Sequence, residues 1–188
     1  NSLDGLSVID VGCGGGLICE PLARLGAEVT GIDATPESIE IAQLHANLMG
    51  LDITYQNKLP EELAQAGVTF DVLVNLEVIE HVADVTAFMT ACASLLKPGG
   101  LMVGGTLNRT VKSLALAKVA AEYLLRWVPA GTHDWRKFVK PSEFGHYLRD
   151  SGLEITDLTG MRLNPLNGNW EFSKNLDVNY FISAQKPQ

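Results

Sequence analysis

The chain has 188 residues, of which 46% are hydrophobic, and this is enough for one domain with a full core. A formal net charge of -8 and a pI near 4.9 argue against nucleic acid as a partner and against a general attraction to anionic membranes. Cys13, Cys19 and Cys92 lack C-x-x-C spacing and so indicate reduced, buried thiols, and no apolar run reaches the roughly 20 residues of a membrane-spanning helix.

The first predicted element is a buried strand over Ser7–Val11, which a glycine-rich turn joins to a helix. Asp10 precedes the turn, whose G-x-G-x-G pattern is made by Gly12, Gly14 and Gly16. Glycine lets the main chain turn sharply and lets a ligand approach the backbone N–H groups at the start of the helix. The dinucleotide fingerprint G-x-G-x-x-G fails here, because Leu17 stands at the position of its third glycine.

A second strand is predicted over Ala27–Ile32, and Asp33 follows it directly. Asp33 lies about 20 residues beyond the first glycine, the separation at which an acidic side chain accepts hydrogen bonds from ribose hydroxyls. The two strands together therefore predict a site for a cofactor that contains adenosine.

The elements that follow alternate between strands and helices. Further strands are predicted over 53–56, 69–75, 101–107, 153–158 and 178–184. Helices are predicted over 16–26, 36–49, 60–66, 85–96 and 142–150. The alternation predicts an α/β fold with a doubly wound, mostly parallel seven-stranded sheet. Only a loop, 160–177, separates the last two strands, so we expect the closing strand to pair antiparallel with its neighbour.

The fourth strand, 69–75, delivers its following loop to the carboxyl edge of the sheet, where ligands bind in this class of fold. Glu77, Glu80 and His81 are spaced i, i+3 and i+4, so one helical turn would place all three on one face. Two carboxylates and an imidazole suit Mg²⁺ or Mn²⁺, with Zn²⁺ as an alternative. If the substrate is a catechol, such a metal would bind both oxygens and lower the pKa of a hydroxyl. Without a metal, His81 alone is a candidate general base, or the loop shapes the pocket.

The segment 111–135 is not needed by a minimal fold of this kind and is unusually apolar. From 114 to 128 its charged residues are Lys118, Glu122 and Arg126, which are four apart and so form one narrow helical stripe. A helix of this composition is a buried core helix, or it lies against a lipid bilayer or a long isoprenoid chain.

The glycine pattern flanked by Asp10 and Asp33 resembles class I S-adenosylmethionine-dependent methyltransferases. Over nearly the whole chain the sequence resembles the ubiquinone-biosynthesis O-methyltransferases. The resemblance rests on the stretches 8–16, 77–82, 97–100, 106–110, 121–123, 128–135 and 177–180. Methyltransferases at large share the first and third of these stretches, whereas Thr-Leu-Asn-Arg, Gly-Thr-His-Asp and Asp-Val-Asn-Tyr are more specific.

The resemblance implies one methyltransferase domain over 1–188 that methylates a hydroxyl of a polyprenylated catechol or demethylated ubiquinol. It implies cofactor contacts from Asp10, Gly12, Gly14, Gly16, Asp33 and Leu76. It also implies Mg²⁺ held by Glu77, Glu80 and His81, with Glu80 and His81 as the catalytic residues. A family arginine that contacts the cofactor, and an N-terminal lid segment, have no counterpart in this sequence.

The resemblance further implies membrane lipid contact through 111–135. The expected location is the bacterial cytoplasm, peripheral on the inner membrane, or the matrix face of the mitochondrial inner membrane. Other ubiquinone-biosynthesis proteins are expected partners. His133 and Asp134 are interpreted either as residues that position the substrate or form a gate, or as hydrogen-bonded loop anchors.

Other functions remain open from the residues alone. One is an O-methyltransferase for another phenolic substrate, with His81 as a metal-free base. A nicotinamide-dependent oxidoreductase is disfavoured by the glycine spacing, and a nucleic-acid methyltransferase by Leu76–Glu77 in place of a Pro-Pro-aromatic loop. The non-enzymatic alternative is a scaffold that binds the cofactor within a biosynthetic complex.

Overall fold

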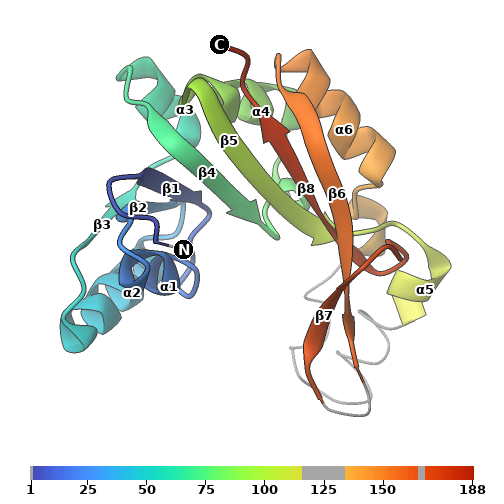
Figure 1. Ribbon diagram of the computed structural model, residues 1–188, viewed down its shortest axis with the longest axis horizontal. Helices are drawn as coiled ribbons and strands as arrows, with labels where there is room; N and C mark the ends of the chain where they lie inside the picture. The colour runs from blue at the N-terminus through green and yellow to red at the C-terminus, as the bar shows by residue number, and fades with distance from the viewer. Residues whose placement is uncertain (1, 116–133, 165–167) are drawn as a thin grey trace.

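The computed structural model describes residues 2–115, 134–164 and 168–188 (Figure 1). The strands are β1 Ser7–Val11, β2 Glu28–Asp33, β3 Ile53–Asn57, β4 Phe70–Leu76, β5 Leu96–Leu107, β6 Glu154–Leu163, β7 Trp170–Ser173 and β8 Asn179–Gln185. The helices are α1 Cys19–Arg24, α2 Pro36–Met49, α3 Pro60–Gln65, α4 Val85–Ser94, α5 Val111–Ser113 and α6 Pro141–Asp150, and 3₁₀ turns span Ile79–His81 and Trp135–Lys137.

All the strands form one sheet in the order β3-β2-β1-β4-β5-β8-β6-β7. Strands β1 to β5 are parallel, and β8 inserts antiparallel between β5 and β6. The predicted doubly wound α/β fold and the antiparallel pairing of the closing strand are confirmed.

The predicted count of seven strands is wrong, because the described residues already form a sheet of eight. The segment 160–177, predicted as a loop, contains the end of β6 and the whole of β7, which pair as an antiparallel hairpin. Strand β7 has only four residues, too few for a clear alternating pattern in the sequence. Strand β5 also begins at Leu96 rather than Leu101, and the ladder to β4 is irregular between Phe70 and Val72, so the Pro-Gly-Gly stretch sits within an interrupted strand.

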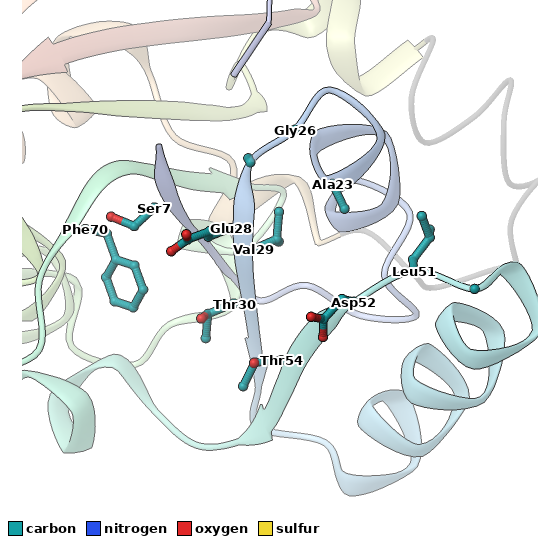
Figure 2. Close-up of a pocket in the computed structure, with 12 residues that line it drawn as sticks. Ser7, Ala23, Gly26, Glu28, Val29, Thr30, Leu51, Asp52, Thr54 and Phe70 are labelled. Carbon is teal, nitrogen blue, oxygen red and sulfur yellow. The ribbon is translucent and has the colours of Figure 1, made fainter. Parts of the chain in front are cut away.

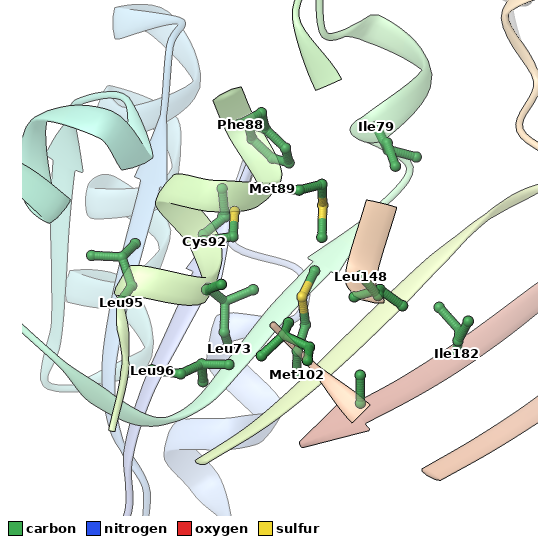
Figure 3. Packing of buried hydrophobic residues seen from close by; sticks show 14 of the residues in the cluster. Leu73, Ile79, Phe88, Met89, Cys92, Leu95, Leu96, Met102, Leu148 and Ile182 are labelled. Carbon is green, nitrogen blue, oxygen red and sulfur yellow. The ribbon is translucent and has the colours of Figure 1, made fainter. Parts of the chain in front are cut away.

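Alternating side chains of the buried strands feed two apolar clusters, one on each face of the sheet. In β1, Val8 joins the cluster under α1 and α2, whereas Ile9 joins the larger cluster under α3, α4 and α6. Figure 3 shows the larger cluster, where Leu73 and Met102 from the sheet meet Phe88 and Cys92 from α4. All three cysteines lie buried with free thiols, as predicted.

A polar cluster at the amino edge fixes β1 beside β4. The Ser7 hydroxyl donates to Asp71 Oδ2 at 2.6 Å, and Lys97 Nζ donates to the same oxygen at 2.8 Å. The hydrogen bonds from Lys97 and then Ser7 hold the pKa of Asp71 well below its ordinary value. The strands therefore start in register, and their carboxyl ends, which bear the candidate site, finish side by side.

The predicted apolar segment 111–135 begins with α5 and ends at the Trp135–Lys137 turn. Its residues 116–133, His133 among them, lie outside the described residues. None of the helices in the described ranges is both long enough and apolar enough to span a bilayer.

We expect Leu73→Ala to lower the free energy of unfolding by about 2–5 kcal/mol, because Leu73 is 0% exposed at the centre of the larger cluster and its loss leaves a cavity. Leu48→Ala removes the same atoms from a side chain that is 72% exposed and should change the free energy of unfolding by less than about 0.5 kcal/mol. Urea denaturation of both variants tests this, and equal losses would contradict the assigned core.

Candidate active site

The glycine-rich turn after β1 is a cradle with one open side. Gly12, Gly14 and Gly16 all have positive φ, at 79°, 52° and 86°, a conformation that other residues rarely adopt. A Cβ on Gly12 would overlap the Val78 side chain, and a Cβ on Gly16 would overlap the Tyr55 hydroxyl. No described atom lies within 4 Å of a Cβ built on Gly14. Protein therefore fills two sides of the turn, and Gly14 leaves room for a ligand.

Asp33 lies across this turn, at the end of β2. Its Oδ2 accepts from the Gly14 N–H at 2.9 Å, and its Oδ1 accepts from the Thr35 N–H at 2.8 Å. Asn57 Nδ2 donates to the Asp33 carbonyl oxygen at 2.8 Å, which ties β3 to the same corner. The acid predicted to accept from ribose hydroxyls is thus placed beside the glycine that leaves space for a ligand.

Asp10 is a buried carboxyl beneath the turn. Its Oδ2 accepts from Cys19 Sγ at 3.3 Å. Burial raises the pKa of Asp10 to about 6, partly offset by the Cys19 hydrogen bond and increased by the charge of Asp33. A carboxyl with this pKa changes charge near neutral pH, so a cation bound nearby would favour its ionised form.

The next strand brings two further groups to the same edge. Asn75 Nδ2 donates to the Val11 carbonyl oxygen at 3.0 Å, while its buried Oδ1 has no hydrogen-bond partner within the described ranges. Leu76 ends β4, and Glu77 has φ of 56°, the only positive φ outside glycine among the described residues. Backbone strain of this kind is concentrated at functional sites. The Glu77 N–H donates to the Gly105 carbonyl oxygen at 2.8 Å, and this hydrogen bond holds Glu77 in the strained conformation.

Glu77 and Glu80 form a close acid pair. Glu80 is 5% exposed, and its Oε2 accepts from Thr106 Oγ1 at 2.9 Å, whereas its buried Oε1 has no donor in the part of the chain that the structure describes. Glu77 keeps part of its surface in water, but crowding by the surrounding protein and then the charge of Glu80 raise its pKa. Two such carboxyls share a proton or bind a cation that prefers oxygen ligands.

His81 does not join this pair in the structure. The predicted arrangement of Glu77, Glu80 and His81 on one helical face is wrong. Glu77 has a left-handed backbone conformation, and the 3₁₀ turn that follows, Ile79–His81, has only three residues, so no regular helix contains all three side chains. Glu80 therefore points into the protein while His81 is exposed. Among the described residues, no three His, Cys, Asp or Glu side chains gather closely enough to hold a metal ion. The acid pair with its unpartnered oxygen fits two ligands of a magnesium ion, and His81 would have to turn inward to supply a third.

A cavity of about 480 Å³ lies elsewhere, at the amino edge of the sheet (Figure 2). Its lining includes Ser7, Glu28 and Phe70, which are the first residues of β1, β2 and β4. Ligands of parallel α/β sheets bind at the opposite, carboxyl edge. This cavity is therefore not the site that the glycine turn and the acid pair build.

The Thr-Leu-Asn-Arg stretch, 106–109, contacts the site and the segments around it through hydrogen bonds and an ion pair. Besides Thr106, Asn108 Nδ2 donates to the Leu176 carbonyl oxygen at 2.8 Å, and Arg109 pairs with Glu143. Sequence reasoning singled out this stretch only by resemblance and missed Thr106 as the partner of Glu80. Asp134 accepts from the Arg136 N–H at 3.1 Å and caps the Trp135–Lys137 turn, so in the structure it anchors a loop.

Proteins of known family share the sequence pattern of this chain over most of its length. A family model described as a methyltransferase domain matches residues 2–158. The chain is 52% identical over 185 residues to a ubiquinone biosynthesis O-methyltransferase from Rhizobium etli, covering 98% of this chain and 75% of that protein. It is 53% identical over 185 residues to the protein of the same name from Cereibacter sphaeroides, with the same coverage of 98% and 75%.

Solved structures share the fold. A magnesium protoporphyrin IX methyltransferase from Synechocystis with bound SAH matches with a TM-score of 0.69 at 24% identity, covering 98% of this chain and 75% of that one. A SAM-dependent methyltransferase from Methanosarcina mazei matches with a TM-score of 0.71 at 20% identity, covering 100% and 94%. The architecture is thus that of class I methyltransferases with a Rossmann-like sheet.

We expect Gly12→Ala to weaken S-adenosylhomocysteine binding at least tenfold, because the new Cβ must displace Val78 and deform the turn. Gly67→Ala is the matched control, since Gly67 also has positive φ, at 71°, but no described atom lies within 4 Å of its Cβ position. Both variants should lose about 1–2 kcal/mol to backbone strain. Isothermal titration calorimetry should find the control binding as tightly as the parent protein.

We expect Asp10→Asn to flatten the dependence of stability on pH. Because the pKa of Asp10 is raised to about 6, the folded chain binds more protons than the unfolded chain between about pH 4 and 6. The free energy of unfolding therefore falls as pH rises through this window. In Asp10→Asn this fall should be smaller by roughly 1–3 kcal/mol. Urea denaturation from pH 4 to 7 tests this, with the exposed Asp52→Asn as a control that should follow the parent curve.

Proposed function

The chain belongs to the family of ubiquinone biosynthesis O-methyltransferases, and from this premise we propose that it methylates a hydroxyl of a polyprenylated catechol or demethylated ubiquinol, with S-adenosylmethionine as donor. The observation that supports this best is the contact between the two loops of the site. Val78 lies between Glu77 and Glu80 in the chain and packs against Gly12. The acid pair is therefore held next to the glycine turn.

The proposed reaction is a direct displacement. A phenolate oxygen attacks the methyl carbon of the donor, and the bond from that carbon to sulfur breaks as the new bond to oxygen forms. The turn would hold the donor through its backbone N–H groups, with Asp33 on the ribose and the main chain at Leu76 closing one side. The contribution of the chain is then alignment of the two reactants and removal of the hydroxyl proton, without a covalent enzyme intermediate.

We further propose that Glu77 and Glu80 hold Mg²⁺, or in its place Mn²⁺ or Zn²⁺, with His81 as a third ligand after rotation. When bound, such an ion would lower the pKa of the acceptor hydroxyl. The unpartnered, buried Oε1 of Glu80 supports this assignment, because a buried oxygen without a partner is costly unless a ligand satisfies it. The alternative is that exposed His81 takes the proton by itself.

The proposed substrate is lipid-soluble and therefore resides in a membrane, so we propose that the chain works at a membrane surface. The chain would work peripherally on the inner membrane of a bacterium, or on the matrix face of the mitochondrial inner membrane, with 111–135 in contact with lipid. Other ubiquinone-biosynthesis proteins would supply the hydroxylated acceptor.

We expect Glu80→Gln and His81→Ala each to lower turnover with a short-tailed catechol at least 100-fold, while S-adenosylhomocysteine affinity changes less than threefold. Both residues lie on the acceptor side of the site, so the donor cradle should survive. Glu154→Gln and His146→Ala alter exposed residues on β6 and α6 and should retain full turnover. Product formation and calorimetry test this, and a parallel loss of turnover and donor binding would remove the proposed roles.

The same assay separates the metal-assisted from the metal-free route. Loss of turnover with chelator and its recovery with Mg²⁺, Mn²⁺ or Zn²⁺ would support the acid pair as a metal site. Full turnover in chelator, lost only in His81→Ala, would assign the proton to His81 instead.

A further inference from the structure

The hairpin of β6 and β7 has one apolar and one polar face. Leu163 lies opposite Trp170, and Met161 lies opposite Phe172, so these four side chains share one face of the two-stranded ribbon. Trp170 is 57% exposed, Phe172 is 78% exposed and Leu163 is 43% exposed. Arg162 and Glu171 occupy the other face, where they form an ion pair at 3.5 Å.

This hairpin extends beyond the body of the protein on the side of the candidate site. Thr106, the partner of Glu80, lies opposite Tyr180, and Tyr180 lies opposite Gly160, where the ladder between β6 and β7 begins. Figure 1 shows the ribbon projecting past the ends of the neighbouring strands, on the same side as α5. A cluster of exposed aromatic and aliphatic side chains on such a projection is typical of an interaction surface.

The chain near the hairpin is basic, although the protein as a whole is acidic. Among the described residues there, 109–115 and 134–140 contain five Lys and Arg against one Asp, whereas residues 2–108 contain three Lys and Arg against fourteen Asp and Glu. Lys112 pairs with Asp177 at 3.1 Å, and Asn175 Nδ2 donates to the same carboxylate, so this basic stretch is joined to the segment that follows β7. Lys137 and Lys174 are exposed and have no ion-pair partner among the described residues.

A second apolar surface offers a comparison. Ile41, Leu44 and Leu48 form an exposed stripe on α2, but the charged side chains around it include Glu37, Glu40 and the Glu20–His45 pair. Acidic surroundings disfavour contact with anionic headgroups, whereas the basic surroundings of the hairpin favour it. The two surfaces are similar in apolar character and differ in charge.

We propose that the apolar face of the β6–β7 hairpin, formed by Met161, Leu163, Trp170 and Phe172, inserts into the surface of a bilayer containing anionic lipid, while Lys137 and Lys174 contact its headgroups. Aromatic side chains favour the boundary between headgroups and acyl chains, and nearby lysines add electrostatic attraction. This inference rests on the proposed function, since it explains how the acceptor edge reaches a lipid-soluble substrate. It concerns a surface separate from the segment 111–135.

Co-sedimentation with vesicles tests the proposal, using phosphatidylcholine alone or mixed with phosphatidylglycerol. The double variant Trp170→Ser and Phe172→Ser should bind mixed vesicles at least tenfold more weakly than the parent protein. Its matched control, Leu44→Ser with Leu48→Ser, removes two exposed apolar side chains from α2 and should bind like the parent. Lys137→Gln and Lys174→Gln should each weaken binding about fivefold on mixed vesicles and leave binding to pure phosphatidylcholine unchanged.

Three results would overturn the proposal. The first is equal vesicle binding by the hairpin variant and the parent. The second is a changed oligomeric state of the hairpin variant in sedimentation velocity, which would assign this face to a second copy of the chain. The third is a marked fall in melting temperature, which would show that the chain itself covers the face.

Activity separates this inference from the proposed function. The hairpin variant should methylate a soluble catechol without a tail at the parental rate, and a loss there would place the hairpin in the acceptor pocket and overturn the lipid contact. If the parent protein methylates no catechol, the proposed function fails, while the vesicle measurements still decide whether the hairpin binds lipid.

Discussion

The site depends on the parallel pairing of β1 with both β2 and β4. This pairing places the ends of three strands at one edge, so the turn after β1 lies next to both Asp33 at the end of β2 and the loop after β4 that begins with Glu77. The contact of Val78 with Gly12 then fixes the distance between the donor turn and the acid-bearing loop. A side chain at Gly12 would separate the loops, which explains why glycine is needed there for packing as well as for its positive φ.

Much of this arrangement follows from local sequence signals. The apolar runs of β1, β2 and β4 carry Asp or Asn at the last or next-to-last residue, before glycine-rich or polar stretches, and parallel pairing of such runs forces their ends together. That is why Asp33 could be placed beside the glycine turn from the sequence alone. The position of Asp10, buried below the turn, follows less directly, because its burial depends on Cys19 of α1 packing against the sheet.

The sequence-based predictions that were wrong or incomplete also have physical causes. Spacing alone placed His81 beside Glu77 and Glu80, but spacing presumes a regular helix, and the left-handed Glu77 followed by a short 3₁₀ turn sends Glu80 and His81 in different directions. Thr106 was missed as a partner of Glu80 because the two residues are 26 positions apart and meet only through the pairing of β4 with β5. Strand β7 was missed because a short edge strand is defined by its partner, β6, more than by its own pattern.

The acids of the site connect stability with function. Asp10 is buried near Asp33, and Glu77 lies against Glu80, so the pKa values of Asp10 and Glu77 are raised by burial and by like charge. Such groups destabilise the fold at neutral pH, since each must lose solvation or keep a proton. A cation held between the two glutamates, as proposed above, would reduce the repulsion between them. On the proposed function, part of the binding free energy of such a cation would come from the release of this repulsion, and this is how the acids would couple stability to function.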